Sequence, residues 1–382
     1  MVSRIAPNGP IMRERCLQYI HKPTWGMYAA GMDHRLIWKI LDWAKERALR
    51  STGDFYFDEE PPEYKDLQRA YRPLTFMKVA AWIRHPLAKD SLIINRLLQY
   101  QHKSGGVFNY IGDDPEKVEE QPVLGPLDTS FFGHLMLALD RRDEAVKAGE
   151  WIRRLVEANR KHMADEGRMF TGMTPEGELI TKVGPGEEYR RFVSNKEPKQ
   201  EFYQVGTSMA YLAVLYDKLR DMWQVTASDA KPYLDNALAL LDFEATMPLE
   251  TYFWPSKCKV AWGAGELLRV LVKYDESEEK IDLASSIGEK VAIHTFITNQ
   301  MSNGGWPAMH YVLSKDEPAI RYGYRPLYDL ICVPSPDGKL TGSNTIYLPS
   351  EELTGEFVGE MKAFEIGLAM QLEYEQNRAA AS

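Results

Sequence analysis

Two residues that could move a proton stand on one apolar helical stretch. Asp128 opens the segment DTSFFGHLMLAL, and His134 follows it about two helical turns later. A buried carboxyl group there would be protonated near neutral pH and could donate a proton. A histidine that faces a cavity serves as a general acid or base in the same range. The structural alternatives are an N-cap aspartate and a core histidine.

A second pair of candidates is formed by two carboxylates. Glu356 and Glu360 are spaced by one helical turn, so their side chains share a face of a helix. If that face is buried, the like charges raise the pKa of one group and make it an acid. The alternative is a pair of solvated glutamates. We count Glu356 as a catalytic candidate and Glu360 as a substrate-binding candidate.

Polar groups also introduce the helical stretch EFYQVGTSMAYLAVLYD. Tyr203, Gln204 and Thr207 offer hydrogen-bond donors and acceptors at its start. We expect Tyr203 to be catalytic and the other two to bind substrate. Tyr189 and Arg190 precede them in EEYRRF, where a guanidinium group suits a carboxylate, phosphate or carbonyl. The alternatives are an ordinary helix cap and solvated arginines.

Lysines and tryptophans lie together in YFWPSKCKVAWGAGELL. Lys257 and Lys259 flank Cys258, with Trp254 and Trp262 close by. A lysine buried among aromatic rings has a lowered pKa or stacks its cation on a ring, so we assign these lysines and tryptophans to substrate binding. Cys258 would be a nucleophile only if the lysines lowered its pKa; the alternative is a packed thiol.

The sequence predicts neither a metal nor a cofactor. The acidic cluster GDDPE at 112–116 does not match the DDxxD or DxDD patterns of diphosphate ionisation and class II protonation. The three cysteines form no CxxC pair or Cys/His ligand cluster. A phosphate-binding glycine loop and a nucleophile elbow are also absent from the sequence.

Bulk properties limit the partners. The 382 residues carry a net charge of −9, which disfavours nucleic acid because phosphate binding needs a basic surface. No run approaches the roughly 18 apolar residues of a membrane span, and the N-terminus lacks the apolar core of a signal peptide. We expect a cytoplasmic protein that binds a small apolar substrate. We expect no nucleic-acid partner and no membrane span, and a homo-oligomer is compatible with the sequence.

Helical periodicity dominates the chain. Amphipathic stretches, such as 143–161 and 282–300, alternate with stretches that are apolar nearly all round, such as 128–139 and 260–272. An outer amphipathic ring around a buried inner ring produces this alternation, which predicts an all-α (α/α)6 toroid. The expected helices are Asp33–Leu49, Tyr64–Trp82, Leu92–Gln101, Leu127–Leu139, Glu144–Arg160, Gln204–Leu219, Tyr233–Leu241, Lys257–Tyr274, Ile281–Asn299 and Phe357–Glu375.

We expect one domain, 1–382. Residues 1–30 are predicted to form an arm or a partial first helix, and 314–354 a rim loop or lid. Short β-hairpins are expected in rim loops at 167–181 and 337–349. In a toroid the inner helices begin at one end of the cavity, so their polar starts should meet there.

Two loops repeat a pattern. QHKSGGVFNY (101–110) and QMSNGGWPAMHY (300–311) both place Gly-Gly and an aromatic residue after an amphipathic helix. Gly-Gly permits a tight turn with positive φ. We therefore expect Phe108 and Trp306 to fold back as plugs or cavity walls, and assign both to substrate binding.

Parts of the sequence resemble linalool dehydratase-isomerase. The resemblance rests on FYQVGTSMAYLAVLYDKL (202–219), on GDDPEKVEE (112–120) after a Gly-aromatic turn, and on Glu197–Pro198. It implies an (α/α)6 toroid with a central apolar pocket, and an assembly such as a dimer or ring. The family's chemistry is metal-free dehydration of a tertiary alcohol by acid and base groups.

The family's catalytic positions are changed in this chain. Its two cysteines fall at Lys196 and Gly206, and its histidine near Leu127 or Asp128. Within QYIHKPTWGMY, His21 stands in place of the family's aspartate and Tyr28 approximately at its tyrosine, so both are assigned to substrate binding. The departures imply a different reaction on the same scaffold.

Three functions remain open on this evidence. The leading one is a metal-independent lyase, isomerase or cyclase that acts on a terpenoid or polyketide-like molecule in an aromatic pocket, by acid/base or pericyclic chemistry. The second is a carbohydrate-active toroid (an epimerase, glycosidase or polysaccharide lyase) with carboxylates such as Asp128 and Glu356 across the cavity. The third is a non-catalytic toroid that binds a ligand.

Overall fold

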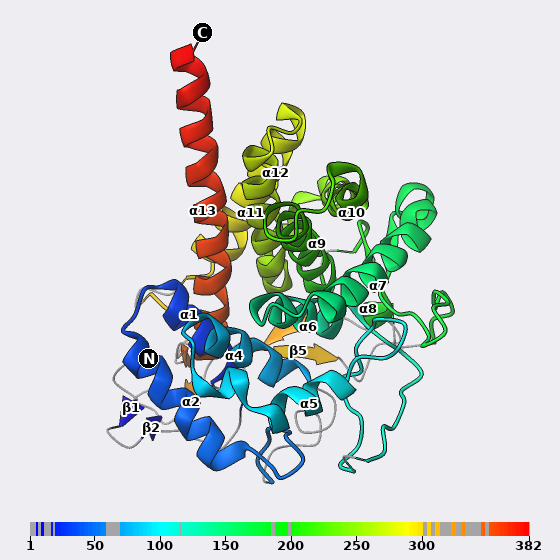
Figure 1. Cartoon of the computed structure of the whole chain (residues 1–382). Coiled ribbons are helices and arrows are strands. Elements are labelled where there is room, and N and C mark those ends of the chain that lie inside the picture. The colour runs from blue at the N-terminus through cyan, green and yellow to red at the C-terminus, as the bar shows by residue number, and fades with distance from the viewer. Residues whose placement is uncertain are drawn as a thin grey trace.

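The computed structural model is mostly helical (Figure 1). It describes residues 5–6, 9–10, 17, 20–58, 69–114, 116–184, 188–197, 200–300, 304–306, 310–313, 322–325, 330–332, 345–347 and 351–381. Cys16 lies outside this part of the chain.

Within the described residues, six helices form a closed inner ring. Each contacts the next in chain order, and the final one returns to the first. α4, α6, α9 and α11 are buried along most of their length, because their sequences are largely apolar, whereas the C-terminal half of α13 is mostly exposed. The inner helices are α1 (His21–Ala29), α4 (Tyr71–Trp82), α6 (Pro126–Ala138), α9 (Tyr203–Asp221), α11 (Cys258–Lys273) and α13 (Glu351–Ala381).

An outer layer alternates with this ring along the chain. The amphipathic α7 packs on α6 and α9, while α10 contacts α9 and α12 contacts α11. The architecture is an (α/α)6 toroid, as the alternation of helix types predicts. The outer helices in the described part are α2 (His34–Ala48), α5 (Ser91–Gln99), α7 (Arg142–Lys161), α10 (Ala227–Ala245) and α12 (Glu278–Val291).

Helix boundaries differ from the sequence predictions at both ends of the chain. Residues 21–29, assigned to an arm or a partial first helix, form the inner helix α1. At the other end α13 begins at Glu351, inside the segment 314–354 that was predicted as a rim loop. α4 begins at Tyr71, and residues 64–68 of its predicted range lie outside the described residues.

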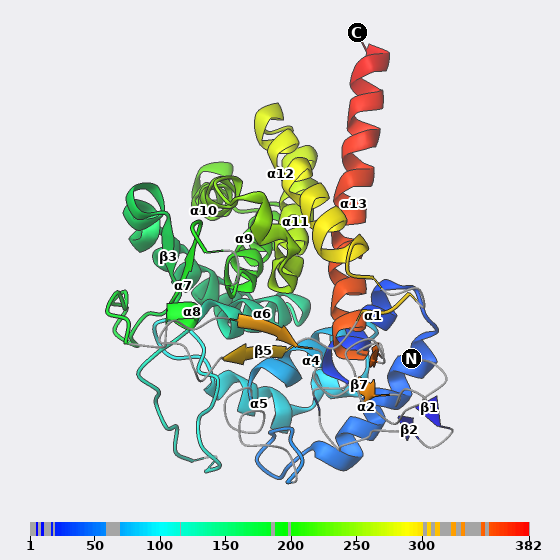
Figure 2. The same cartoon turned by 180° about the vertical axis from the view of Figure 1, so that it is seen from behind.

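Short structures connect the main helices. β3 (Arg168–Phe170) pairs with β4 (Phe192–Ser194), outside the predicted hairpin 167–181. Within that range a short antiparallel turn does form, with the bridge Met173–Leu179 and backbone hydrogen bonds from Thr174 to Glu178 and from Ile180 to Gly172. Figure 2 shows β5 and β7 at the end of the molecule where α13 begins. The other short elements are β1 (Ile5–Ala6), β2 (Gly9–Pro10), η3 (Pro86–Lys89), η4 (His162–Glu166), α8 (Glu188–Arg191), η5 (Leu249–Phe253), η6 (Pro255–Lys257), η7 (Ala292–Ile297), β5 (His310–Leu313), β6 (Tyr322–Arg325), β7 (Leu330–Cys332) and β8 (Thr345–Tyr347).

Glycines bring the first and last inner helices into backbone contact. A Cβ atom at Gly26 of α1 would lie 2.4 Å from the carbonyl oxygen of Gly355 in α13. Gly206 of α9 approaches the backbone of Lys259 in α11 in the same way, at 2.3 Å. Since real Cβ contacts are longer than this, the ring closes tightly only because these positions lack side chains.

The two Gln-Gly-Gly turns have the same local structure. Gln101 and Gln300 each donate from the side-chain amide to the carbonyl of the first glycine, Gly105 or Gly304. Both glycines have positive φ, +99° and +83°. The repeated sequence pattern therefore encodes one type of turn from an outer to an inner helix.

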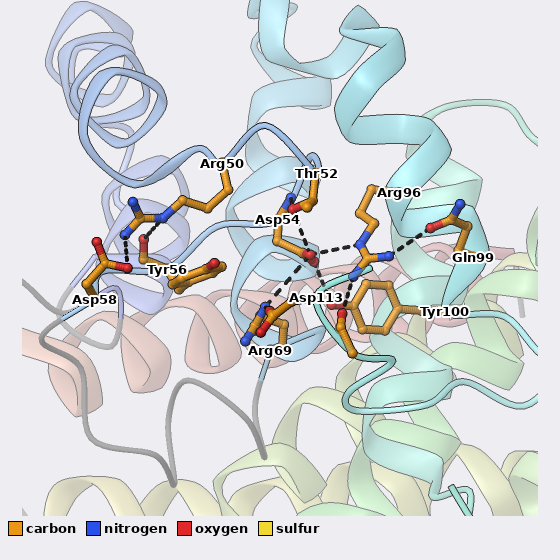
Figure 3. A network of polar contacts seen from close by, with 11 residues as sticks. Arg50, Thr52, Asp54, Tyr56, Asp58, Arg69, Arg96, Gln99, Tyr100 and Asp113 are labelled. Atoms are coloured by element: carbon orange, nitrogen blue, oxygen red, sulfur yellow. Dashed lines mark hydrogen bonds and ion pairs between the residues drawn. The ribbon is translucent and has the colours of Figure 1, made fainter. Parts of the chain in front are cut away.

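A buried ion-pair network ties the loop after α2 to α5 (Figure 3). Asp54 is 4% exposed and accepts hydrogen bonds from Arg96 Nε (2.8 Å) and the Tyr100 hydroxyl (2.6 Å). Arg69 joins Asp54 to Asp113, at 3.8 and 2.9 Å. The charges are compensated within the network, as burial requires.

No described helix is long and apolar enough to cross a membrane.

Candidate active site

Charged side chains meet at the starts of the inner helices. Lys22 of α1 donates to Glu356 Oε2 of α13 at 2.8 Å, and Lys259 of α11 contacts the other oxygen of the same carboxylate. Lys259 also lies 3.5 Å from Glu360 Oε1 and 5.7 Å from the ring centroid of Tyr203. Three inner helices that are distant in sequence thus share one buried charge cluster, as expected for converging helix starts.

The two glutamates of this cluster have very different pKa values. Burial alone would raise the pKa of Glu356, but Lys22 and Lys259 outweigh it and hold the pKa at about 2. Burial raises the pKa of Glu360 to about 8, against Lys259 and with help from the Glu356 charge. One carboxylate is therefore fixed as an anion and the other is protonated near neutral pH, which is the pattern of an acid/base pair.

Cys258 lies beside these carboxylates. Its sulfur and one oxygen each from Glu356 and Glu360 lie within 4.8 Å of one another. Burial, followed by the Glu360 charge, raises the pKa of the thiol well above its usual value, so Cys258 is not an activated nucleophile. The Lys259 ammonium already supplies a cation to both carboxylates, which disfavours a metal ion at this point.

Deeper in the ring, aromatic residues surround Lys78 of α4. Its Nζ lies 4.3 Å from the ring centroid of Trp25, 4.8 Å from Trp262, 5.0 Å from Trp82 and 5.4 Å from Phe131. The amine has no hydrogen-bond partner among the described residues. Burial lowers its pKa to about 7, while Glu266 and Glu360 act in the opposite direction.

His134 borders this aromatic cage, which consists of Trp25, Trp82, Phe131 and Trp262. Its ring stacks on Trp262 at 4.7 Å and meets Tyr211 edge-on at 5.2 Å. Its Nε2 atom is buried and has no hydrogen-bond partner in the part of the chain that the structure describes. Burial and the nearby Lys78 charge lower the pKa of His134 well below 6.5, so the imidazole is neutral and able to accept a proton.

Asp128 stands at the start of α6. The residue is partly exposed, but its Oδ1 atom is buried and no described residue donates a hydrogen bond to it. Gly125, rather than Asp128, occupies the N-cap position of α6. Burial raises the pKa of Asp128 to about 7, so a cap role does not account for it.

Buried polar atoms without hydrogen-bond partners recur on the inner helices. Such atoms normally find a partner in protein, water or ligand. Within the described residues they include one donor amine, an imidazole nitrogen, a hydroxyl and three acceptor groups. They belong to Lys78, His134, Ser130, Asp128, Gln204 and Glu360.

Other predicted site residues lie elsewhere. Lys257 pairs with the buried Glu244 of the outer helix α10 and lies over the rings of Phe202 and Tyr252, so it faces away from the cluster at Glu356. Trp254 is buried at the turn before it.

The remaining aromatic candidates are dispersed. Tyr28 packs on Trp82 at the far end of α1, with ring centroids 5.0 Å apart. Phe108 packs edge-on against His102. Trp306 packs on Phe357 and borders a hollow of about 340 Å³ beside Ala29 and Met361.

Three polar candidates sit at helix starts. His21 meets Tyr71 edge-on at 5.4 Å beside the charge cluster, and burial, then Lys22, lowers its pKa well below 6.5. Thr207 donates to the Tyr203 carbonyl, and Gln204 donates to Glu201. The side chains of Tyr189 and Arg190 lie outside the described residues.

Sequence reasoning missed Lys22, Lys78 and Trp25. A signal for Lys78 was present, since it is the one lysine in YRPLTFMKVAAW, whose residues 71–80 are all buried. Lys22 and Trp25 lie in QYIHKPTWGMY, where the resemblance directed attention to the neighbouring His21 and Tyr28 instead.

Comparisons with known proteins find similarity of fold. No protein-family model matches the sequence, and no curated protein matches it either. A crystal structure of D-mannose isomerase is similar, with a TM-score of 0.55 and 12% sequence identity over 92% of this chain and 87% of the other. At this identity the similarity shows a shared toroid architecture.

Proposed function

We propose that this protein is an isomerase or epimerase that moves a proton within a small carbohydrate-like molecule bound inside the helical ring. The observation that carries the proposal is the set of unsatisfied polar atoms on the inner helices, which includes both donors and acceptors. A polyhydroxylated ligand would satisfy them, and the aromatic rings beside them offer flat surfaces for its C–H faces. The shared fold with D-mannose isomerase agrees with this assignment.

Two groups have protonation states that suit such a reaction. Glu360, with a pKa of about 8, carries a proton that it can donate to a carbonyl oxygen of the substrate. His134 is neutral and can take the proton from the neighbouring carbon. Glu356 remains an anion and keeps the Lys259 ammonium in place beside Glu360.

An apolar terpenoid substrate suits these groups less well. Each buried donor or acceptor that it left unpaired would cost about 1–3 kcal/mol. One observation favours the dehydratase-like alternative, namely the four aromatic rings, since ring faces also stabilise a carbocation. The Lys78 amine, however, already lies within that cage.

Deuterium exchange tests the proposed function directly. The protein is incubated in deuterated buffer with a panel of aldoses and ketoses, and NMR follows deuterium at the carbon next to the carbonyl. We expect exchange and sugar interconversion, with kcat reduced about 10²–10⁴-fold in Glu360→Gln because the general acid is lost.

Glu373→Gln is the matched control, since Glu373 lies exposed on the same helix. Equal rates for Glu360→Gln and wild type would remove Glu360 from the mechanism. Failure to exchange any sugar, combined with retention of a terpenoid by the purified protein, would favour the dehydratase-like alternative.

A further inference from the structure

Among the described residues, three buried lysines lie on the inner helices α1, α4 and α11, and two of them are paired. Lys22 and Lys259 both bind the Glu356 carboxylate. Lys78 is 1% exposed and makes no hydrogen bond to any described residue. An unpaired amine in the interior costs stability, so its retention in a hydrophobic ring needs an explanation other than packing.

The surroundings of Lys78 suit an amine that acts as a nucleophile. Four ring faces lie 4.3–5.4 Å from Nζ and shield it from water without accepting a hydrogen bond from it. The rings attract the ammonium form, but burial outweighs this attraction and lowers the pKa to about 7. A lysine desolvated in this way is a better nucleophile than an exposed one, because more of it is uncharged at neutral pH. One wall, Trp82, is 39% exposed, so the cage borders the protein surface there.

We propose that Lys78 is a covalent catalytic residue that forms an imine with the aldehyde or ketone group of the substrate. The inference rests on the proposed function to the extent that it needs a carbonyl compound, such as an open-chain sugar. It adds a reaction intermediate and a second role for the aromatic cage, which would surround the iminium cation.

The proposed step is balanced without an oxidant or metal. The Nζ lone pair attacks the carbonyl carbon, and the C=O π electrons move to oxygen, which takes up a proton. The carbinolamine then loses water when Glu360 donates its proton to the departing hydroxyl group. The positive iminium withdraws electrons from the adjacent C–H bond, so that a base such as His134 can remove the proton and form an enamine. Reprotonation of the same carbon, on either face, restores the iminium. Addition of water to the iminium carbon then releases the epimerised or exchanged carbonyl compound and the free amine, and the proton set free returns to Glu360.

Reductive trapping tests this proposal without knowledge of the true substrate. The intact protein is incubated at neutral pH with glycolaldehyde and sodium cyanoborohydride, and modified lysines are located by peptide mass spectrometry. We expect Lys78 to be modified at least about tenfold faster than the exposed Lys39 and Lys161, because a lower pKa leaves more free amine. The Lys78→Arg and Lys78→Met variants should lose this fast adduct while retaining the circular dichroism spectrum of the wild type.

Modification of Lys78 no faster than of the exposed lysines overturns the proposal. Equal fast labelling in Lys78→Met also overturns it, because the reactive amine would then be another residue. The two proposals fail separately: an unchanged rate in Glu360→Gln with fast labelling of Lys78 refutes only the acid role of Glu360. Sugar exchange that persists at the wild-type rate in Lys78→Met refutes only the imine.

Discussion

Burial favours the uncharged forms of both Lys78 and Glu360. The pKa of the lysine falls to about 7 and that of the glutamate rises to about 8. Each would be charged at neutral pH on the surface. In the ring, a proton can therefore be held by either group at little cost in free energy, which is what a proton-transfer site requires.

Replacement of Lys78 by methionine should stabilise the protein in a pH-dependent manner. The folded-state pKa of about 7 lies below the unfolded value of about 10.4, so the unfolded chain binds more protons between these values and the lysine destabilises the fold most below about pH 7. We expect Lys78→Met to gain a few kcal/mol at about pH 6 and much less at about pH 9.5. Urea unfolding at the two pH values measures this, and an equal gain at both would contradict the assignment.

The pH–rate profile should report the acid. Because Glu360 must be protonated to act, kcat should fall as pH rises through about 8. Glu356, with a pKa of about 2, should not titrate in the working range. A profile measured with the sugar found by deuterium exchange provides the test, and a flat limb above pH 8 would exclude Glu360 as the acid.

The sequence predicts part of this site from local spacing. The one-turn separation of Glu356 and Glu360 predicts a shared face. The pKa of Glu360 is raised chiefly by burial, and the like charge of Glu356 adds to this. The pairing of Glu356 with Lys22 could not be predicted, since 334 positions separate these two residues in the sequence. The cage around Lys78 likewise combines rings from α1, α4, α6 and α11, and no local pattern brings these together.

At the scale of elements, the tightest packing lies where α1 meets α13. We expect Gly26→Ala to destabilise the protein by several kcal/mol, because its Cβ would overlap the backbone of Gly355, which cannot move without displacing a helix. Gly125→Ala is the control, since a Cβ there meets nothing within 4 Å. Its cost should stay below about 1 kcal/mol. Thermal unfolding of both variants decides this, and equal midpoints would show that the helices can separate at little cost.

The buried network of the outer layer allows a second comparison. Asp54→Asn should cost about 3–5 kcal/mol, because Arg96 and Arg69 would keep their buried charges without the carboxylate. Asp58 pairs with Arg50 but its side chain is 76% exposed, so Asp58→Asn should change stability by less than about 1 kcal/mol. Denaturant titrations would contradict the structural role of the network if both variants lost the same free energy.

The alternation of helix types predicted the toroid, whereas the strands were harder to predict. Strands as short as Arg168–Phe170 carry little register information, and β3 pairs with β4 across more than twenty residues rather than with its neighbour. The sequence does not identify α1 as an inner helix, because its first three residues, His21, Lys22 and Pro23, do not resemble an apolar core segment.

At the scale of the whole molecule, α13 completes the ring. Truncation after residue 350 should abolish cooperative unfolding, because it exposes the buried faces of α1 and α11 and leaves Lys22 and Lys259 without Glu356. Truncation after residue 375 removes only the exposed end of α13 with its Arg378–Glu278 ion pair, and should cost less than about 1 kcal/mol. Calorimetry of both proteins measures this, and a cooperative transition in the shorter one would show that five inner helices suffice.

Ring closure between α1 and α13 also has a consequence during synthesis on the ribosome. Glu360, the candidate acid, and Glu356 both lie on α13, which follows every other described helix along the chain. A nascent chain that lacks α13 therefore exposes the buried faces of α1 and α11, and neither Lys22 nor Lys259 can yet bind Glu356. Closure of the ring and placement of the candidate acid thus depend on the same helix, so we expect a chain halted before α13 to expose apolar surface and to bind chaperones.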